Sequence, residues 1–264
     1  MRLPIPAALW LASTALCQAP PGDAHAGHAA HGSVDAVAAL DPLRDAGVPA
    51  ADREKALAAK GGSIAEAAWK SIESCDACLA ANDLAALLAA RPAAELAPLA
   101  PAMAAKLKDG SPAIRAAAAR ALCAVPEAQR PDAAKSLKPD TLKTTTVVGK
   151  MAWEPKEFTV APGALVCLRM QNPDSMQHNM LLIAAGSLSE IGVAAEKMGE
   201  GLEGKRRQWV PESAKVLAVM GLVAPGQSGE FWFFAPEKPG TYPLVCTYPG
   251  HWRLMNGKLK VKKD

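Results

Sequence analysis

The sequence lacks several features that would place it in familiar functional classes. Its 29 lysine and arginine residues nearly balance 26 aspartate and glutamate residues, and so small a net charge gives no indication of nucleic-acid binding. The apolar run at residues 5–16 is too short to cross a bilayer. Histidine is scarce, with five in 264 residues. None follows Cys75-Asp-Ala-Cys78, which excludes covalent haem attachment at that pair.

The N-terminus has the pattern of an export signal. Met1-Arg2, the apolar run and the small residues after it predict a secretory signal peptide over residues 1–24, with cleavage after Ala24 or Ala26. Thr14-Ala-Leu-Cys17 is an imperfect lipoprotein signal, because leucine precedes the cysteine. A lipid at Cys17 would tether the chain to a membrane surface. We therefore expect a periplasmic or secreted protein, with lipoprotein anchoring as the alternative.

Residues 25–34 form a polar segment with no helical or strand periodicity. His25, His28 and His31 recur at every third position, a density that suits weak copper or zinc binding by imidazole. A solvated low-complexity linker explains the same composition. Both interpretations remain open from the sequence.

Residues 35–138 are rich in alanine and leucine and predict a helical domain, because aromatic and β-branched residues are almost absent. Ser63-Ile-Ala-Glu66 has the form of a capping box, and Ser111-Pro112 places an N-cap serine before a first-turn proline. The segment 96–125, two predicted helices around Asp109-Gly-Ser-Pro, resembles a HEAT-type repeat. Repeats of this kind need a neighbour to cover their ends.

Two cysteines in this helical domain suggest a structural role. A redox-active pair and a zinc site are alternatives for Cys75 and Cys78, although no second ligand pair accompanies them. In an exported protein we expect Cys75 or Cys78 to form a disulfide with Cys123. The sequence does not fix the pairing among Cys75, Cys78, Cys123 and Cys167.

Beyond residue 142 the pattern predicts strands separated by proline and glycine, as in a small β-sandwich over residues 143–264. A helix outside the sheets is expected over residues 187–203. The chain is thus a multidomain α plus β protein. The predicted strands are 144–148, 157–160, 165–170, 179–183, 229–234, 241–246 and 258–261.

A short stretch near the C-terminus contains three kinds of metal ligand. Cys246-Thr-Tyr-Pro-Gly-His251-Trp-Arg-Leu-Met255 places a thiol, an imidazole and a thioether within ten residues. A thiolate and imidazoles in a trigonal plane, with a thioether at longer range, form a blue-copper electron-transfer site. Because three of the five histidines lie in the tail, His178 is the natural second imidazole. The Tyr-Pro-Gly turn keeps the ligand loop short and stiff.

At these residues the sequence resembles the azurin and plastocyanin type of cupredoxin, and most of all the azurin branch. The loop from Cys246 through Met255 and Asn-Gly-Lys-Leu follows the azurin ligand loop, and Gln-His178-Asn179 follows its upstream ligand. The resemblance covers about the last 120 residues, one domain's length. It implies a Greek-key β-sandwich that binds one type 1 copper ion. The implied ligands are His178, Cys246 and His251, with Met255 axial and the carbonyl of Gln177 opposite.

One residue departs from this family pattern, and other copper centres fit less well. Azurins usually have glycine where this chain has Gln177, which puts the second axial contact in question. A trinuclear cluster would need histidines beside the cysteine, but Val245 and Thr247 flank it. A dinuclear thiolate centre would need a second cysteine in the loop, and the loop has none.

The resemblance implies an electron carrier that is not an enzyme and passes single electrons between redox partners. Copper storage or delivery, using the same site and the His-rich tail, is the alternative. A third interpretation is an accessory domain once fused to a dehydrogenase. Pro249, Gly250, Trp252 and Leu254 around His251 predict an apolar rim where redox proteins dock transiently.

The run Glu230-Phe-Trp-Phe-Phe234 breaks the alternation of a half-solvated strand. Both faces of this strand should therefore be covered. We expect the helical domain to dock on its outer face and to bury Trp232, Phe234 and Cys167.

Overall fold

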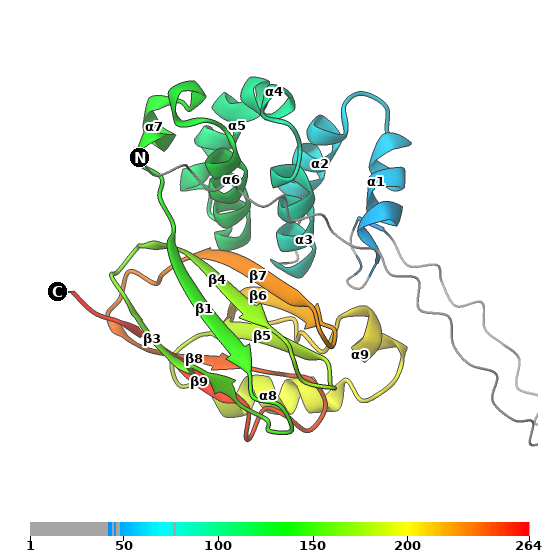
Figure 1. The fold of residues 1–264 in the computed structure, drawn as a ribbon, viewed down its shortest axis with the longest axis vertical. Coiled ribbons are helices and arrows are strands. Elements are labelled where there is room, and N and C mark those ends of the chain that lie inside the picture. The colour runs from blue at the N-terminus through cyan, green and yellow to red at the C-terminus, as the bar shows by residue number, and fades with distance from the viewer. Residues whose placement is uncertain (1–41, 44, 46–47, 76–77, 264) are drawn as a thin grey trace, which may run out of the picture. The chain divides into compact units, whose positions relative to one another are not determined.

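The computed structural model describes residues 42–263 except 44, 46–47 and 76–77. The predicted signal peptide, the lipidation at Cys17 and the His-rich tail lie outside these described residues. Helices form the first half of the described chain and strands most of the second half, as the sequence predicts (Figure 1). Among the described residues, no helix is both long enough and apolar enough to traverse a bilayer.

The helical part contains the helices α1–α7 and three short 3-10 turns, η1–η3. Two predicted caps are confirmed: Ser63 accepts a hydrogen bond from the backbone N–H of Glu66, and Ser111 accepts one from Ile114. The elements are α1 (Ala50–Ala58), α2 (Ile64–Glu73), α3 (Cys78–Ala89), α4 (Ala93–Leu96), η1 (Ala97–Leu99), α5 (Ala100–Ala105), η2 (Lys106–Lys108), α6 (Pro112–Ala124), η3 (Glu127–Gln129) and α7 (Asp132–Lys135).

The first helix of the predicted HEAT-type repeat is interrupted. The segment 96–108 is not one helix but the last residue of α4 followed by η1, α5 and η2. Pro98 and Pro101 stand at the starts of η1 and α5, because proline lacks the N–H that a helix interior uses. The second helix, α6, agrees with the prediction within a residue. The repeat itself stays a prediction.

The helical part has its own apolar core. Leu84 and Leu88 of α3 and Leu122 of α6 are completely buried there. The alanines of α6 that face them, including Ala118 and Ala121, are also inaccessible to solvent. Such small side chains let the helix axes approach closely, and Trp69 of α2 is an aromatic residue buried in this core.

Strands β1–β9 form two sheets in the described chain. The sheet orders are β2-β1-β4-β7 and β3-β9-β8-β5-β6, with β1 parallel to β4 and β3 parallel to β9. Their inner faces share one apolar core. The strands are β1 (Asp140–Thr146), β2 (Trp153–Glu154), β3 (Glu157–Val160), β4 (Leu165–Gln171), β5 (His178–Ile183), β6 (Val216–Val223), β7 (Ser228–Phe234), β8 (Gly240–Val245) and β9 (Asn256–Val261).

The strand predictions omit two strands, displace both ends of the first one and differ by one or two residues at several other ends. The first strand begins at Asp140, three residues before the predicted domain start, and ends before Val148. The prediction missed the short β2 and the long β6. Strand β6 shows no alternation of polar and apolar residues, because the sandwich core lies on one face and helix α3 lies near the other.

The helical part docks on β7, as predicted, but through the edge of the sandwich: α6 packs against β7 and α3 against β6, the edge strands of the two sheets. The side chain of Arg120 on α6 donates to Glu230 on β7 at 2.8 Å. Cys167 is buried, but Trp232 and Phe234 are only half-buried, so that part of the prediction is wrong. Both rings line a cleft between α6 and β7, which keeps them accessible.

The predicted disulfide of Cys123 is wrong, since this residue is a free thiol. Cys75 packs near Ala113, at the start of α6, whereas Cys123 lies ten residues further along the same helix. Ten helical residues span about 15 Å. A disulfide requires its two Cα atoms to lie within about 7 Å of each other.

Two helices interrupt the sandwich between β5 and β6. They are α8 (Leu188–Lys197) and α9 (Leu202–Arg206), where one helix was predicted over 187–203. We call residues 187–211 the insertion. Its apolar residues Ile191 and Val210 pack with Val245 of β8, so the insertion lies against the outer face of the second sheet.

Candidate metal centre

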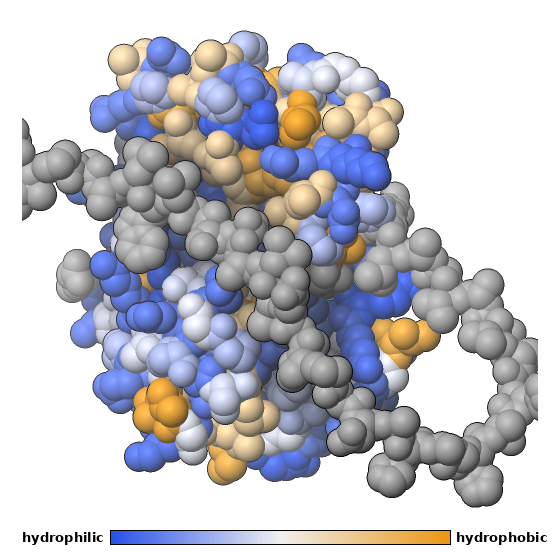
Figure 2. Space-filling view, turned by 45° about the vertical axis from the view of Figure 1, so that its right-hand side comes forward, coloured by the Kyte–Doolittle hydropathy of each residue, from blue (hydrophilic) through white to orange (hydrophobic). Residues whose placement is uncertain are grey.

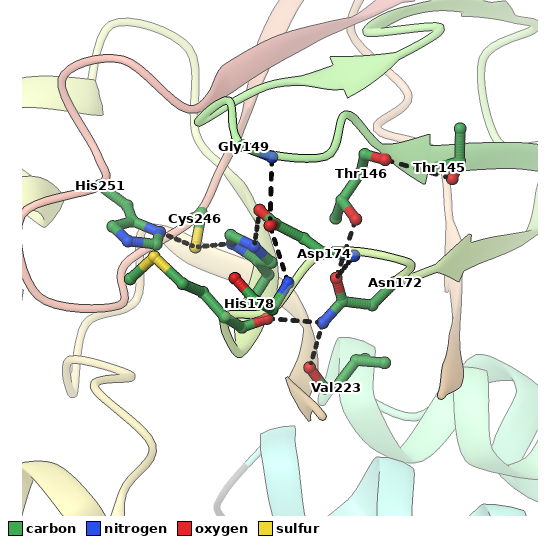
Figure 3. Close-up of polar contacts among 11 residues, drawn as sticks. Thr145, Thr146, Gly149, Asn172, Asp174, His178, Val223, Cys246 and His251 are labelled. Carbon is green, nitrogen blue, oxygen red and sulfur yellow. Dashed lines mark hydrogen bonds and ion pairs between the residues drawn. The ribbon is translucent and has the colours of Figure 1, made fainter. Parts of the chain in front are cut away.

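The three predicted principal ligands lie together at one end of the sandwich (Figure 3). His178 is the first residue of β5, Cys246 follows the last residue of the neighbouring β8, and His251 lies in the loop before β9. The sulfur of Cys246 lies 4.0 Å from Nδ1 of His178 and 3.6 Å from Nδ1 of His251. All three side chains are buried.

This spacing fits a metal in a trigonal plane. Bonds of about 2.0 Å to imidazole nitrogen and about 2.3 Å to thiolate sulfur, as zinc forms, hold sulfur and nitrogen about 3.7 Å apart. The observed separations of 3.6 and 4.0 Å bracket that value. One soft thiolate and two imidazoles are the donors of a blue-copper site. The residues therefore fit the predicted copper ion.

The structure also places the two predicted axial residues. Met255 is completely buried, and its backbone is tied to the ligand loop: its carbonyl accepts from the N–H of Cys246 and its N–H donates to the carbonyl of His251. Gln177 directly precedes His178, and its side chain is exposed. Axial ligation by either residue remains a proposal.

Asn179 links the two ligand segments. Its side-chain oxygen accepts from the backbone N–H of Thr247 at 2.7 Å, and its amide donates to the hydroxyl of the same residue at 2.9 Å. Asn179 also donates to the carbonyl of Gln208, at the end of the insertion. Because Asn179 follows His178 and Thr247 follows Cys246, these bonds hold the two ligands at a fixed separation.

A buried carboxylate lies behind one ligand imidazole. Nε2 of His178, the ring nitrogen that faces away from Cys246, lies 3.2 Å from Oδ2 of Asp174. The other carboxylate oxygen accepts from the backbone N–H groups of Ser175 at 2.8 Å and Gly149 at 3.2 Å. Asp174 is only 5% exposed. Each oxygen of this carboxylate thus has its own partner.

Burial determines the protonation of the ligands before any metal binds. It raises the pKa of Cys246 to about 12, so the thiol keeps its proton. It lowers the pKa of His251 to about 4, with help from the neighbouring His178. Burial lowers the pKa of His178 as well, although Asp174 opposes the shift. Both imidazoles are therefore neutral at pH 7, and a metal needs to displace only the thiol proton.

The carboxyl group of Asp174 is ionised. Burial alone would raise its pKa, but the backbone N–H groups of Gly149 and Ser175, together with His178, outweigh that effect and hold the pKa below its usual value. An ionised carboxylate can only accept hydrogen bonds.

Trp252 does not form part of an exposed apolar rim around His251, so the prediction is wrong for this residue. Trp252 is only 8% exposed, because the insertion covers it. Its ring lies so close to Gly192 of α8 that any Cβ at that position would collide with it. His251 itself is 1% exposed, whereas Leu254 in the same loop is 70% exposed.

The sequence interpretation assigned no role to Asp174 or Asn179. Asn172-Pro-Asp174 has the composition of a turn, which explains an aspartate without any function. The only signal was the four-residue spacing between Asp174 and His178. The amide of Gly149, which orients the carboxylate, lies 25 residues away in sequence and gave no signal at all.

Comparison with known proteins gives matches to the strand-rich half of the chain. Residues 140–262 match the model of the copper-binding proteins of the plastocyanin/azurin family. The chain is 30% identical over 125 residues to auracyanin-A of Chloroflexus aurantiacus, which covers 47% of this chain and 75% of that protein. It is 32% identical over 112 residues to azurin of Pseudomonas aeruginosa, covering 40% and 69% of the two chains.

This chain is similar to a solved structure of auracyanin A, described as a "blue" copper protein. The match covers 47% of this chain and 100% of the auracyanin A chain. Its sequence identity to this chain is 30% and the TM-score is 0.43. The family match begins at the first residue of β1, so the helical part lies outside it.

Proposed function

Because the chain belongs to the plastocyanin/azurin family of copper-binding proteins, we propose that it is an electron carrier with one type 1 copper ion. The observation that supports this most directly is the buried cluster of Cys246, His178 and His251, whose ligand atoms all lie within 4.8 Å of one another. Bound copper supplies the one-electron chemistry of such a site. We assign the axial positions to Met255 and the carbonyl of Gln177.

The protein's own contribution is to fix the positions of the ligands and to exclude solvent from them. The bonds of Asn179 to Thr247 and Gln208 fix the ligand segments on β5, β8 and the insertion. Cuprous and cupric copper favour different ligand geometries. A ligand geometry that is held between the two reduces the rearrangement that accompanies each electron transfer. Electron transfer at this site makes and breaks no covalent bond, so we assign no enzymatic activity.

Copper delivery is the weaker proposal. A delivery protein must surrender its metal to an acceptor, and this is easiest when ligands are accessible. Here His178, Cys246 and His251 are each at most 1% exposed. Such burial favours a protein that keeps its copper while electrons pass.

The partners and location are part of the same proposal. We place transient docking of redox proteins at the ligand loop, where Leu254 is exposed, and not at Trp252. Hydrophilic residues predominate on the face in Figure 2, where strongly hydrophobic residues form small separate spots. Small apolar contacts suit encounters that release quickly. The predicted signal peptide supports a periplasmic or secreted location, and a lipid at Cys17 would add a membrane tether.

Copper(II) loading tests the proposal directly. The wild-type protein should show an intense visible charge-transfer band, because the thiolate is a ligand. Cys246→Ser should abolish the band and leave the far-UV circular dichroism unchanged. Cys123→Ser removes a free thiol from the helical part and should keep the band. A colourless copper-loaded wild type would refute the blue-copper assignment.

A retention assay separates carrier from delivery protein. The copper-loaded protein should keep its metal in the presence of a competing chelator and exchange electrons rapidly between its oxidised and reduced forms. Rapid copper loss with slow electron exchange would favour delivery.

A further inference from the structure

The two ligand imidazoles differ on the side that faces away from the thiol. Nε2 of His178 meets the buried carboxylate of Asp174 at 3.2 Å. Nε2 of His251 is also buried but has no hydrogen-bond partner among the described residues. In both rings Nδ1 is the atom nearest Cys246. One ligand therefore has a charged acceptor behind it and the other has none.

The carboxylate is held in one orientation by groups that do not touch the ligands. Oδ1 of Asp174 accepts from the amides of Gly149 and Ser175, which leaves Oδ2 for the imidazole. The backbone N–H of Asp174 donates to Asn172, whose side-chain oxygen also accepts from Thr146 on β1 (Figure 3). The strand β1 and the turn after it thus brace the carboxylate.

Gly149 is suited to this bracing role. It adopts a φ of +68° in the turn between β1 and β2, a conformation that glycine tolerates best. Its backbone N–H donates to Asp174, which lies in the segment before β5. The same segment is also joined to β1 by the hydrogen bond from Thr146 to Asn172. The orientation of Asp174 is therefore determined by the neighbouring Ser175 and by strand β1 with the turn after it.

We propose that Asp174 is a positioning residue that fixes the tautomer of His178 and strengthens Nδ1 as a copper ligand. This rests on the proposed copper site. A neutral imidazole has one N–H, and a carboxylate oxygen can only accept, so the proton lies on Nε2. Nδ1 then presents its lone pair to the metal. The carboxylate also raises the basicity of the ring, as outer partners of metal-bound histidines do.

The redox consequence follows from the charge. A more basic imidazole and a nearby negative charge stabilise cupric copper more than cuprous copper. Asp174 therefore lowers the reduction potential of the site. His251, which has no such partner, makes no equivalent contribution.

Asp174→Asn gives the sharpest test because it changes charge and hydrogen bonding without changing shape. The amides of Gly149 and Ser175 would retain the side-chain oxygen of asparagine, so its NH₂ group would face His178. The proton of His178 should then move to Nδ1, the wrong tautomer for binding, as in a serine-protease triad with the same substitution. Asp174→Ala should leave both tautomers populated.

Nitrogen-15 NMR of the metal-free protein measures the tautomer at a pH where imidazole is neutral. His178→Gln identifies the signal of His178 as the one that disappears, since four other histidines keep theirs. In the wild type we expect protonation at Nε2, and in Asp174→Asn at Nδ1. Protonation of wild-type His178 at Nδ1 would overturn the proposal, even if every variant failed to fold.

Metal binding gives the second measurement. Copper(II) affinity, determined by chelator competition, should fall about 10- to 100-fold in Asp174→Asn. Each tenfold loss of copper(II) over copper(I) affinity should raise the reduction potential by about 59 mV. Glu190→Gln removes an exposed carboxylate from α8 and should change neither quantity. Equal affinities and potentials for Asp174→Asn and the wild type would overturn the proposal.

The two measurements also separate this proposal from the electron-carrier function. A protein that binds copper without a visible band would refute the blue-copper function, but the tautomer of metal-free His178 would still test Asp174. Conversely, a blue protein whose Asp174→Asn variant behaves as the wild type would refute only the role of Asp174.

Discussion

Individual residues at the copper end differ in how far sequence predicts them. Cys246, His251 and Met255 occupy one short loop, so residue type and spacing identify them without a structure. His178 follows by elimination, because few histidines are available. Asp174 could not be predicted, since its function depends on backbone amides that the fold brings to it.

Met255 provides a prediction at this scale. Met255→Leu should keep copper and the visible band but raise the reduction potential, because an electron-rich donor to copper(II) is lost. We expect a rise of the order of 59 mV, which corresponds to a tenfold change in the ratio of the two copper affinities. Cyclic voltammetry of the loaded protein measures it.

A second buried methionine provides a control for the effect of a Met→Leu substitution in the core. Met170 of β4 is also completely buried, and Met→Leu exchanges in cores usually cost below about 1.5 kcal/mol. Met170→Leu should leave the potential unchanged. If Met255→Leu also leaves it unchanged, Met255 is not an axial ligand.

Among the elements, the insertion departs most from its prediction. Its helical character was expected from the sequence, but its position over Trp252 was not. A tryptophan beside a ligand histidine suggests a docking surface when the loop is considered alone. Only the contact with Gly192 of α8 reveals why the ring is buried. Strand β6 was missed for a related reason, since burial on both faces removes the alternation that marks a strand.

Gly192→Ala tests whether α8 depends on this contact. Helix propensity alone would make the variant more stable by up to about 1 kcal/mol. The added Cβ collides with the Trp252 ring, however, and overpacking costs about 1–3 kcal/mol. We therefore expect a net loss of unfolding free energy, measured by urea denaturation, and faster hydrogen exchange in α8.

Gly201 supplies the control in the same insertion. It is exposed, and a Cβ added there would meet no atom within 4 Å. Gly201→Ala should change the hydrogen exchange of α8 little. If Gly192→Ala stabilises the protein as helix propensity predicts, Trp252 does not pack against α8.

In the whole molecule, the helical part and the sandwich share a charged contact where α6 packs against β7. Glu230 of β7 accepts from Arg120 of α6 at 2.8 Å and from Arg169 of β4 at 2.8 Å. Its backbone carbonyl accepts from Asn82 of α3. The sequence predicted the docking from the aromatic run on β7. It could not predict this ion pair, because its partners lie 110 and 61 residues from Glu230.

Glu230 should make the stability of the molecule sensitive to acid. Burial alone would raise its pKa, but Arg120, Trp232 and Arg169 outweigh burial and hold it below the usual value. A carboxyl whose pKa is lower in the folded state stabilises that state at neutral pH. This contribution is lost as the pH falls through the folded pKa, where Glu230 becomes protonated and Arg120 is left without its charged partner.

The substitution Glu230→Gln tests this contribution. At neutral pH it should lower the unfolding free energy by about 2–3 kcal/mol, near the lower limit for breaking a buried pair because the glutamate is 27% exposed. The difference from the wild type should shrink as the pH falls below the usual pKa of a glutamate. Urea denaturation across pH measures both effects. The matched variant Glu157→Gln removes an exposed carboxylate on β3 that also pairs with two cations, and it should cost much less than Glu230→Gln because solvent screens exposed ion pairs. A difference between Glu230→Gln and the wild type that stays constant across pH would show that the lost contact, and not the charge, stabilises the docking.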